Sequence, residues 1–172
     1  MSLAVPRVET SRLVLRAFAA TDVEPYVRMM GDPEVTRFLG DGRPLDRTDA
    51  WRQLALLIGH WELRGFGLWA VEERATGRFV GRLGCWEPEG WPGFELGYVL
   101  AREAWGRGLA REGAAAALAF ARGPLGRATV ISLIRPENFA SVSVAEHLGA
   151  HRTRSVEFYG SPTDVYTYPL SG

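Results

Sequence analysis

The segment Glu95-Leu96-Gly97-Tyr98-Val99-Leu100, followed closely by Trp105-Gly106-Arg107-Gly108-Leu109-Ala110, carries the most information in this sequence. Its first half is typical of a β-strand. Its second half is typical of a glycine-bearing loop that opens into an alanine-rich helix, residues 110–122. Gly106 and Gly108 let the backbone approach a ligand with no Cβ in the way. Because the helix directs its free N–H groups and the positive end of its dipole at the same point, the segment predicts a pyrophosphate site.

The spacing of these glycines separates the site from two common nucleotide-binding motifs. The pattern G-x-G-x-x-G fails because its last position is Arg111. A P-loop needs a lysine, and the chain has none.

Composition and charge place the chain among ordinary globular proteins and predict a single domain, residues 1–172. The apolar fraction is 47%, the charged fraction 23% and the net charge zero, so no electrostatic feature favours nucleic acid or a membrane surface as a partner. No apolar run approaches the length of a membrane span, and the N-terminus lacks a signal-peptide pattern. We therefore expect a cytoplasmic protein.

The residues that most often bind metals are sparse. The one cysteine, Cys85, cannot form an internal disulfide or a metal cluster, and we expect it to be a small buried hydrophobe. The three histidines, His60, His147 and His151, lack metal-ligand spacing. We expect no metal site.

Apolar periodicity and turn residues give an order of elements, β-α-α-β-β-β-α-β-α-β-β. Strands are predicted over residues 12–18, 66–73, 79–86, 95–100, 128–134, 151–158 and 164–170. Helices are predicted over residues 23–30, 47–64, 110–122 and 138–148. Residues 35–42 are predicted to form a loop or short turn. This mixed order favours an α/β (α+β) sheet with helices packed on it over a doubly wound fold.

Side chains at the helix starts and on one helix face support these assignments. Thr21 with Glu24 resembles a capping box for the first helix, and Asp46 or Thr48 can cap the second. The second helix carries a stripe of apolar residues predicted to face the core. Its members are Trp51, Leu54, Leu57, Ile58 and Trp61.

Four motifs in order resemble the GNAT superfamily of acyl-CoA-dependent N-acetyltransferases. They are ETSRLVLR at residues 9–16, FVGRLG at 79–84, the strand at 95–100 with its loop at 105–110, and the block from Asn138 to Gly149. The first is typical of the RimJ/RimL type, which acetylates protein N-termini and small amines. The loop is similar to the family pattern Q/R-x-x-G-x-G/A, with Trp105 in place of Gln or Arg.

The resemblance implies a GNAT-like fold and a cleft for the acyl donor. The expected fold is a mixed, mostly antiparallel sheet of about seven strands with about four helices. Two strands splay apart between Val99-Leu100 and residues 128–134 to form the acyl-CoA cleft. Acetyl-CoA is the implied co-substrate.

The resemblance also implies which residues bind this co-substrate. The pantetheine arm would pair with the backbone of Val99 and Leu100, and an N–H of one of these two residues would polarise the thioester carbonyl. The pyrophosphate would lie on the loop, Asn138 would hydrogen-bond the arm, and Ser141 would lie near the thioester sulfur or the phosphate arm. The expected cofactor-binding residues are Val99, Leu100, Trp105, Gly106, Arg107, Gly108, Leu109, Ala110, Arg111, Asn138 and Ser141.

The reaction is attack of a neutral amine on a thioester carbonyl. Glu95 is the expected base, acting through water. The family's tyrosine acid would stand at position 145, which is Ala145 here, so Ser141, Tyr98 or bulk water would protonate the thiolate. An α-amine has a pKa of about 7.7–8.0 and a lysine side chain about 10.4, so a weak acid–base apparatus favours protein N-terminal α-amines as acceptors.

The same residues fit other interpretations. The chain could acetylate a small molecule such as an antibiotic, a polyamine or an amino acid, or bind acyl-CoA without catalysis. Trp86 and Trp91 either line an acceptor site or pack in the turn, and Asp32 and Glu34 either face a cationic acceptor or are solvated. The oligomeric state, including a homodimer, is open.

Overall fold

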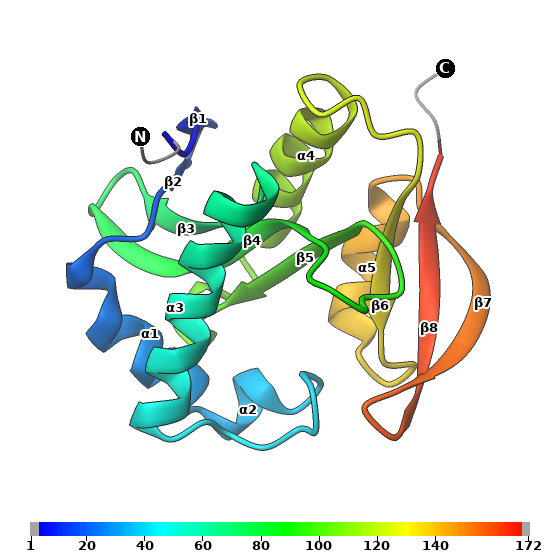
Figure 1. The fold of residues 1–172 in the computed structure, drawn as a ribbon, viewed down its shortest axis with the longest axis horizontal. Coiled ribbons are helices and arrows are strands. Elements are labelled where there is room, and N and C mark those ends of the chain that lie inside the picture. The colour runs from blue at the N-terminus through cyan, green and yellow to red at the C-terminus, as the bar shows by residue number, and fades with distance from the viewer. Residues whose placement is uncertain (1–3, 170–172) are drawn as a thin grey trace.

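The computed structural model describes residues 4–169 as one mixed sheet of eight strands with helices on both faces (Figure 1). The strand order is β1-β2-β3-β4-β5-β6-β8-β7. The strands are β1 (Val8–Glu9), β2 (Leu13–Arg16), β3 (Leu68–Glu73), β4 (Arg78–Trp86), β5 (Glu95–Leu100), β6 (Val130–Ile134), β7 (His151–Phe158) and β8 (Ser161–Tyr168). The α-helices are α1 (Val23–Met30), α2 (Pro33–Thr36), α3 (Arg47–Arg64), α4 (Leu109–Arg122) and α5 (Phe139–His147). The predicted fold class is confirmed, with β1 and α2 as the elements that the sequence did not indicate.

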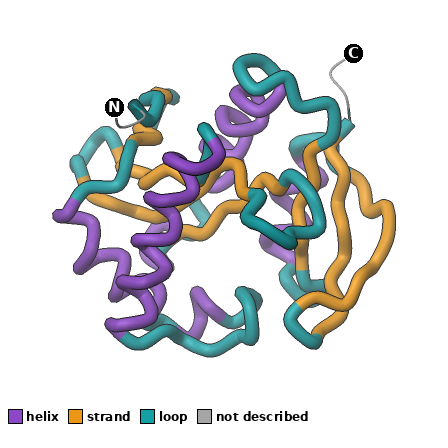
Figure 2. Tube along the Cα trace, viewed as in Figure 1, coloured by secondary structure: helices purple, strands orange, loops and turns teal. Residues whose placement is uncertain are grey.

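The sheet opens between β5 and β6. All other neighbouring strands are antiparallel, whereas β5 and β6 are parallel and pair at a single position, Glu95 opposite Ile131. Beyond that pair the two strands separate. Figure 2 shows the strands on either side of this point running in different directions. The splayed strands predicted from the sequence are therefore present.

Helices α4 and α5 cover one face of the sheet. The core on this side contains Leu83 and Cys85 of β4, with Ala117 of α4. Gly113 brings α4 close to the sheet, because a Cβ at this position would lie 2.3 Å from Leu83 Cδ2. Cys85 is fully buried as predicted, and burial raises the pKa of its thiol to about 12.

Helices α1 and α3 form a second core on the opposite face, which includes Tyr26, Leu54 and Leu57. The predicted α3 stripe is correct for Leu54, Leu57 and Trp61 but wrong for Trp51 and Ile58, whose side chains are 56% and 50% exposed. At 3.6 residues per turn, these two positions lie about 65–90° around the helix from the centre of the buried stripe.

The N-terminal cap predicted for α3 is present in the structure, whereas the one predicted for α1 is not. Asp46 caps α3 by accepting a hydrogen bond from Asp49 N at 2.8 Å, one of the two predicted caps. The predicted Thr21–Glu24 capping box is wrong. Asp22 takes this place because its carboxylate accepts from Ala19 N and pairs with Arg16 at 2.7 Å.

Two loop assignments also change. The predicted loop 35–42 begins within α2, whose start is capped by Asp32 accepting from Glu34 N. The last strand, β8, begins at Ser161 rather than at 164, because the turn tightens to Tyr159 and Gly160, both with positive φ. Leu170, the predicted end of that strand, lies outside the described residues.

Two features of residues 4–169 bear on the expected partners. Within this part of the chain, no helix combines the length and apolar character needed to cross a bilayer. The same residues hold no group of three or more histidine, cysteine, aspartate or glutamate side chains placed to bind a metal ion.

Candidate active site

Two cavities meet where β5 and β6 separate. One, of about 430 Å³, contains Glu95 and is called the Glu95 cavity below. The other, of about 490 Å³, contains the loop before α4 and is called the loop cavity. The residues that line both are Phe38, Leu39, Tyr98, Val99, Asn138 and Ser141. A molecule in one cavity can therefore reach a molecule in the other beside these side chains.

The loop cavity is bounded by backbone suited to an anion. Gly106 and Gly108 have φ of 70° and 74°, which side-chain-bearing residues rarely adopt. A Cβ at Gly106 would meet no atom within 4 Å, so this glycine borders open space. Gly108 is the N-cap of α4 and offers no side-chain cap, which leaves the first N–H groups of the helix for a ligand.

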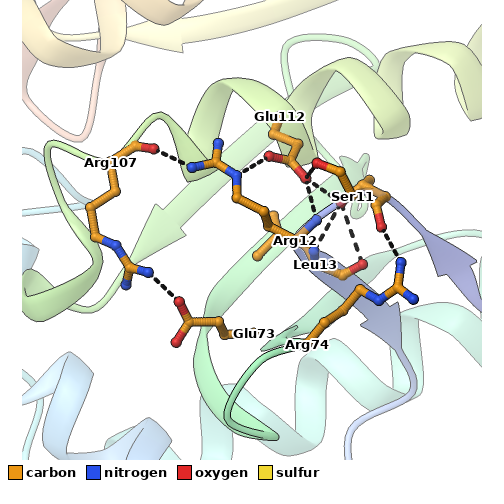
Figure 3. A network of polar contacts seen from close by, with 8 residues as sticks. Ser11, Arg12, Leu13, Glu73, Arg74, Arg107 and Glu112 are labelled. Carbon is orange, nitrogen blue, oxygen red and sulfur yellow. Dashed lines mark hydrogen bonds and ion pairs between the residues drawn. The ribbon is translucent and has the colours of Figure 1, made fainter.

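Ten of the eleven residues expected to bind the co-substrate line this cavity. They are Val99, Leu100, Trp105, Gly106, Gly108, Leu109, Ala110, Arg111, Asn138 and Ser141. The side chain of the eleventh, Arg107, is paired with Glu73, and its carbonyl oxygen accepts a 2.7 Å hydrogen bond from Arg12 Nη1 (Figure 3). Arg107 thus ties the loop to β3 and to the residue that precedes β2.

Glu112 of α4 anchors the same loop from the other side (Figure 3). Its carboxylate accepts hydrogen bonds from Thr10 Oγ1 at 2.6 Å, Ser11 Oγ at 3.0 Å, and Arg12 N and Nε at 2.8 and 2.6 Å. Burial alone would raise the pKa of Glu112, but the hydrogen bonds from Thr10 and Arg12 outweigh it and lower the pKa to about 2. The start of α4 is therefore fixed to the start of β2 by an ionised carboxylate.

The register of β5 determines which backbone groups face the opening. Ala101 N donates to Val80 O at 2.9 Å, so by the alternation of an antiparallel ladder the N–H of Val99 also faces β4. The N–H of Leu100 points the other way, toward the opening. The carbonyl oxygen of Leu100 accepts a 2.9 Å hydrogen bond from Trp105 Nε1, which fixes this strand end to the loop.

Glu95 lies at the only β5–β6 pair, half-buried in the wall of its cavity. Its Oε2 accepts a 2.7 Å hydrogen bond from Trp91 Nε1, and its Oε1 accepts one from Leu133 N at 3.4 Å. Burial raises the pKa of Glu95 to about 7, although both hydrogen bonds oppose the rise. A carboxylate with this pKa can take up and release a proton at neutral pH.

Hydroxyl groups lie where the two cavities meet. Tyr98 Oη donates a 2.9 Å hydrogen bond to Ser141 O, and Asn138 Oδ1 accepts one from Ser141 N at 3.3 Å, which leaves the Asn138 amide N–H groups for a ligand. Burial and the neighbouring Tyr168 raise the pKa of Tyr98 well above its usual value, so its phenol is protonated at neutral pH. Ala145 is fully buried in the core.

Aromatic rings form much of the Glu95 cavity. Trp86, Trp91, Phe158 and Tyr159 all line it, and the rings of Trp91 and Phe158 meet edge to face at 4.9 Å between centroids. This contact joins the β4–β5 turn to the end of β7. Gly97 lies in the same wall, and a Cβ there would have Leu68 Cδ2, at 3.9 Å, as its nearest neighbour. The cavity therefore exists partly because position 97 has no side chain.

A sequence profile of the acetyltransferase (GNAT) domain matches residues 12–151. The chain belongs to the GNAT acetyltransferase family. A crystal structure of an acetyltransferase from Agrobacterium tumefaciens str. C58 superposes on this GNAT chain with a TM-score of 0.86 and 30% identity, covering 98% of this chain and 96% of that one.

Relatives in sequence span most of this GNAT chain. Bacillus subtilis YkkB is 29% identical over 168 residues, 93% of this chain and 94% of that protein. FsC-acetyl coenzyme A-N(2)-transacetylase of Aspergillus fumigatus is 30% identical over 158 residues, 85% of this chain and 65% of that protein. The family and these relatives identify the protein as an acetyltransferase enzyme.

The structure adds residues to the GNAT site that sequence reasoning missed. Arg82 and Gln53 line the Glu95 cavity together with Phe158 and Tyr159. Arg82 could have been noticed in the sequence, because it is a charged residue within an otherwise apolar strand. Asp32, weighed as a residue facing the acceptor, instead caps α2 and pairs with Arg102 at 3.0 Å.

Proposed function

We propose that this GNAT enzyme transfers an acetyl group from acetyl-CoA directly to a primary amine, with a protein N-terminal α-amine as the first acceptor to test. The observation that carries the proposal is the junction of the two cavities at Tyr98, Val99, Asn138 and Ser141. A donor over the loop and an acceptor beside Glu95 would meet at this junction.

The loop cavity fits the donor. Its left-handed glycines and the uncapped start of α4 suit a pyrophosphate, which the N–H groups from Gly108 onward would receive. The Asn138 amide would bind the pantetheine arm. The N–H of Leu100 faces the opening, so we assign it rather than Val99 to the thioester carbonyl.

Glu95 is the proposed general base. When bound, acetyl-CoA supplies a thioester whose carbonyl carbon bonds to the amine nitrogen as its C–S bond breaks. Glu95 takes the proton that the amine loses, through a water molecule, and its pKa of about 7 suits that role near neutral pH. The two hydrogen bonds to its carboxylate hold it in position for this transfer.

The departing sulfur needs a proton, which we assign to a hydroxyl at the junction. Ser141 lines both cavities, and Tyr98 does so with a protonated phenol. Ser141 is our first candidate and Tyr98 our second. The family's tyrosine position, Ala145, is buried in the core and has no such role.

The finer assignment to the RimJ/RimL type rests on the sequence at residues 9–16 and on the ease of deprotonating an α-amine. We likewise propose that residues 1–172 form a single catalytic domain. A small-molecule acceptor remains the alternative substrate class, because the Glu95 cavity, at about 430 Å³, has a volume typical of small-ligand sites. Non-catalytic binding of acyl-CoA is the alternative without chemistry.

The test is release of free thiol from acetyl-CoA with a panel of N-terminal peptides, polyamines, amino acids and aminoglycosides. Turnover confined to one class, and lowered at least about tenfold by Glu95→Gln, supports the proposal. Single variants Ser141→Ala and Tyr98→Phe then separate the two candidate acids. Tight acetyl-CoA binding without turnover on any acceptor contradicts it and favours the binding-protein alternative.

A further inference from the structure

The Glu95 cavity has an unequal distribution of charge. Its charged lining residues are Arg82, Glu89, Glu95 and Arg135. Glu89 has a fully exposed side chain at the rim, where it pairs with Arg64 at 3.3 Å, and Arg135 donates to Gly40 O. The lining charges without a carboxylate partner are therefore Arg82, Glu95 and Arg135, and of these Arg82 and Glu95 lie on neighbouring strands of the sheet.

Arg82 and Glu95 lie on the same face of the sheet. In the β4–β5 ladder Arg82 is opposite Val99 and Trp86 is opposite Glu95, so the two charged residues stand four positions apart along this face, with Gly97 between them on β5. Because Gly97 has no side chain, the space between the guanidinium and the carboxylate is left to the cavity.

Arg82 lacks the partner that a half-buried arginine normally has. Within residues 4–169, its Nε is the one buried side-chain nitrogen or oxygen that has no hydrogen-bond partner, and none of the ion pairs in this part of the chain includes its guanidinium. Its contact is the phenol of Tyr26, whose hydroxyl donates in turn to Gln53 Oε1 at 2.6 Å. This contact is neutral, and the negative charge that acts on Arg82 is the Glu95 carboxylate, whose pKa Arg82 lowers through the charge interaction without direct pairing.

Arg16 has the carboxylate partners that Arg82 lacks. Arg16 is also half-buried, and its guanidinium is held by Asp22 and Glu72, each at 2.7 Å. A partly desolvated arginine without such an anion carries an energetic cost that a bound anion would relieve. At Arg82 the open side is a substrate cavity.

We propose that the acceptor of this enzyme is a primary amine that also bears a carboxylate, and that Arg82 binds this carboxylate while the amine lies beside Glu95. The inference rests on the proposed function. The planar guanidinium matches a carboxylate through two parallel hydrogen bonds, which makes Arg82 a specificity-determining residue. An α-carboxylate and an acidic side chain at a peptide N-terminus are the two sources of this group.

The test compares matched acceptors in the thiol-release assay. Amino acids against their amides probe the α-carboxylate, and C-terminally amidated peptides that begin with Glu or Gln probe the side-chain carboxylate. Because loss of a carboxylate also changes the pKa of the amine itself, each preference is compared between wild type and Arg82→Gln. Arg78→Gln is the matched control, an exposed arginine on the same strand outside the Glu95 cavity.

We expect wild type to prefer the carboxylate-bearing member of at least one pair. Arg82→Gln should lower kcat/KM for that member about tenfold or more, the effect of losing a charge-assisted hydrogen bond, with little change for the neutral member. Arg82→Lys should recover part of the preference, and it tests the charge if the glutamine variant folds poorly. Arg78→Gln should leave the preference unchanged.

Equal use of carboxylate and neutral acceptors by wild type overturns this inference and leaves the acetyltransferase proposal standing. An equal loss for both members of a pair in Arg82→Gln, with Arg82→Lys no better, also overturns it. Absence of thiol release with every acceptor overturns the proposed function itself, and this inference with it.

Discussion

The indole nitrogen of Trp91 donates a 2.7 Å hydrogen bond to Oε2 of Glu95. The two residues belong to one turn-and-strand segment, and their bond keeps the carboxylate oriented in its cavity. It also stabilises the ionised form, so it restrains the rise in the pKa of Glu95 that burial causes.

The pH dependence of activity should therefore reflect Glu95. We expect kcat/KM of the wild type to rise with pH through about 7, as the carboxyl group with its raised pKa loses its proton and becomes a base. Glu95→Gln should lose this limb and retain acetyl-CoA affinity, measured by calorimetry. A glutamine variant with the wild-type pH profile would contradict the assignment of the base.

Trp91→Phe should move this limb to higher pH. The change removes the donor to Glu95, so the ionised carboxylate loses a stabilising partner and its pKa rises further, by about one unit for a bond of 1–2 kcal/mol. Trp86→Phe removes an indole from the same cavity wall without removing a hydrogen bond to Glu95, and serves as the control. An unchanged limb in Trp91→Phe would show that the bond does not control the titration.

Gly97→Val should block the acceptor without disturbing the fold. The added Cβ makes only an ordinary contact with Leu68 Cδ2 at 3.9 Å, so we expect a nearly unchanged melting temperature, unchanged acetyl-CoA binding and a rise of about tenfold or more in KM for the amine. Gly81→Ala provides the contrast, because its Cβ would lie 2.4 Å from Val99 O and should destabilise the protein. Unaltered acceptor kinetics in Gly97→Val would place the acceptor elsewhere.

Glu112→Gln should weaken both the fold and the loop. The folded-state pKa of about 2 lies below the ordinary value of 4.5, so the stabilisation by Glu112 is fully present above pH 4.5 and is lost as pH falls toward 2. At pH 7 the variant should lose up to about 3 kcal/mol of unfolding free energy, and at pH 3 the difference should fall to less than about half of that. Denaturant titrations at pH 7 and pH 3, with exposed Glu146→Gln as control, measure it.

Weaker acetyl-CoA binding should accompany that loss, since Glu112, Arg12 and Arg107 together position the start of α4. Full acetyl-CoA affinity in a destabilised Glu112→Gln variant would show that the loop holds its geometry without this anchor.

The sequence predicted those helices and strands whose ends are marked by capping residues or glycines. The limits of α1 and α3 agree with the predicted 23–30 and 47–64, because glycines end both helices and Asp46 marks the start of α3. The four-residue helix α2 was missed because one turn carries no periodicity. Trp51 and Ile58 were misplaced because apolar character alone does not show how wide the buried stripe is.

The candidate site likewise contains residues that the sequence predicted and residues that it could not predict. The loop glycines and Glu95 could be found because chemistry and spacing coincide within short segments. Arg82 could not be paired with Glu95 from the sequence, since their relation depends on the register of β4 against β5. The aromatic wall needed the contact of Trp91 with Phe158, residues that only the completed sheet brings together.

The single residue pair that joins β5 to β6 has a consequence for the lifetime of the protein. A molecule bound along the exposed edge of β5 supplies hydrogen bonds that a neighbouring strand supplies elsewhere in the sheet, so its occupancy adds to the free energy of folding. The gain grows logarithmically with ligand concentration and reaches about 2.7 kcal/mol at a hundredfold excess over Kd. Ligand-bound and ligand-free molecules of this protein would then differ in resistance to proteolysis, although their sequence is the same.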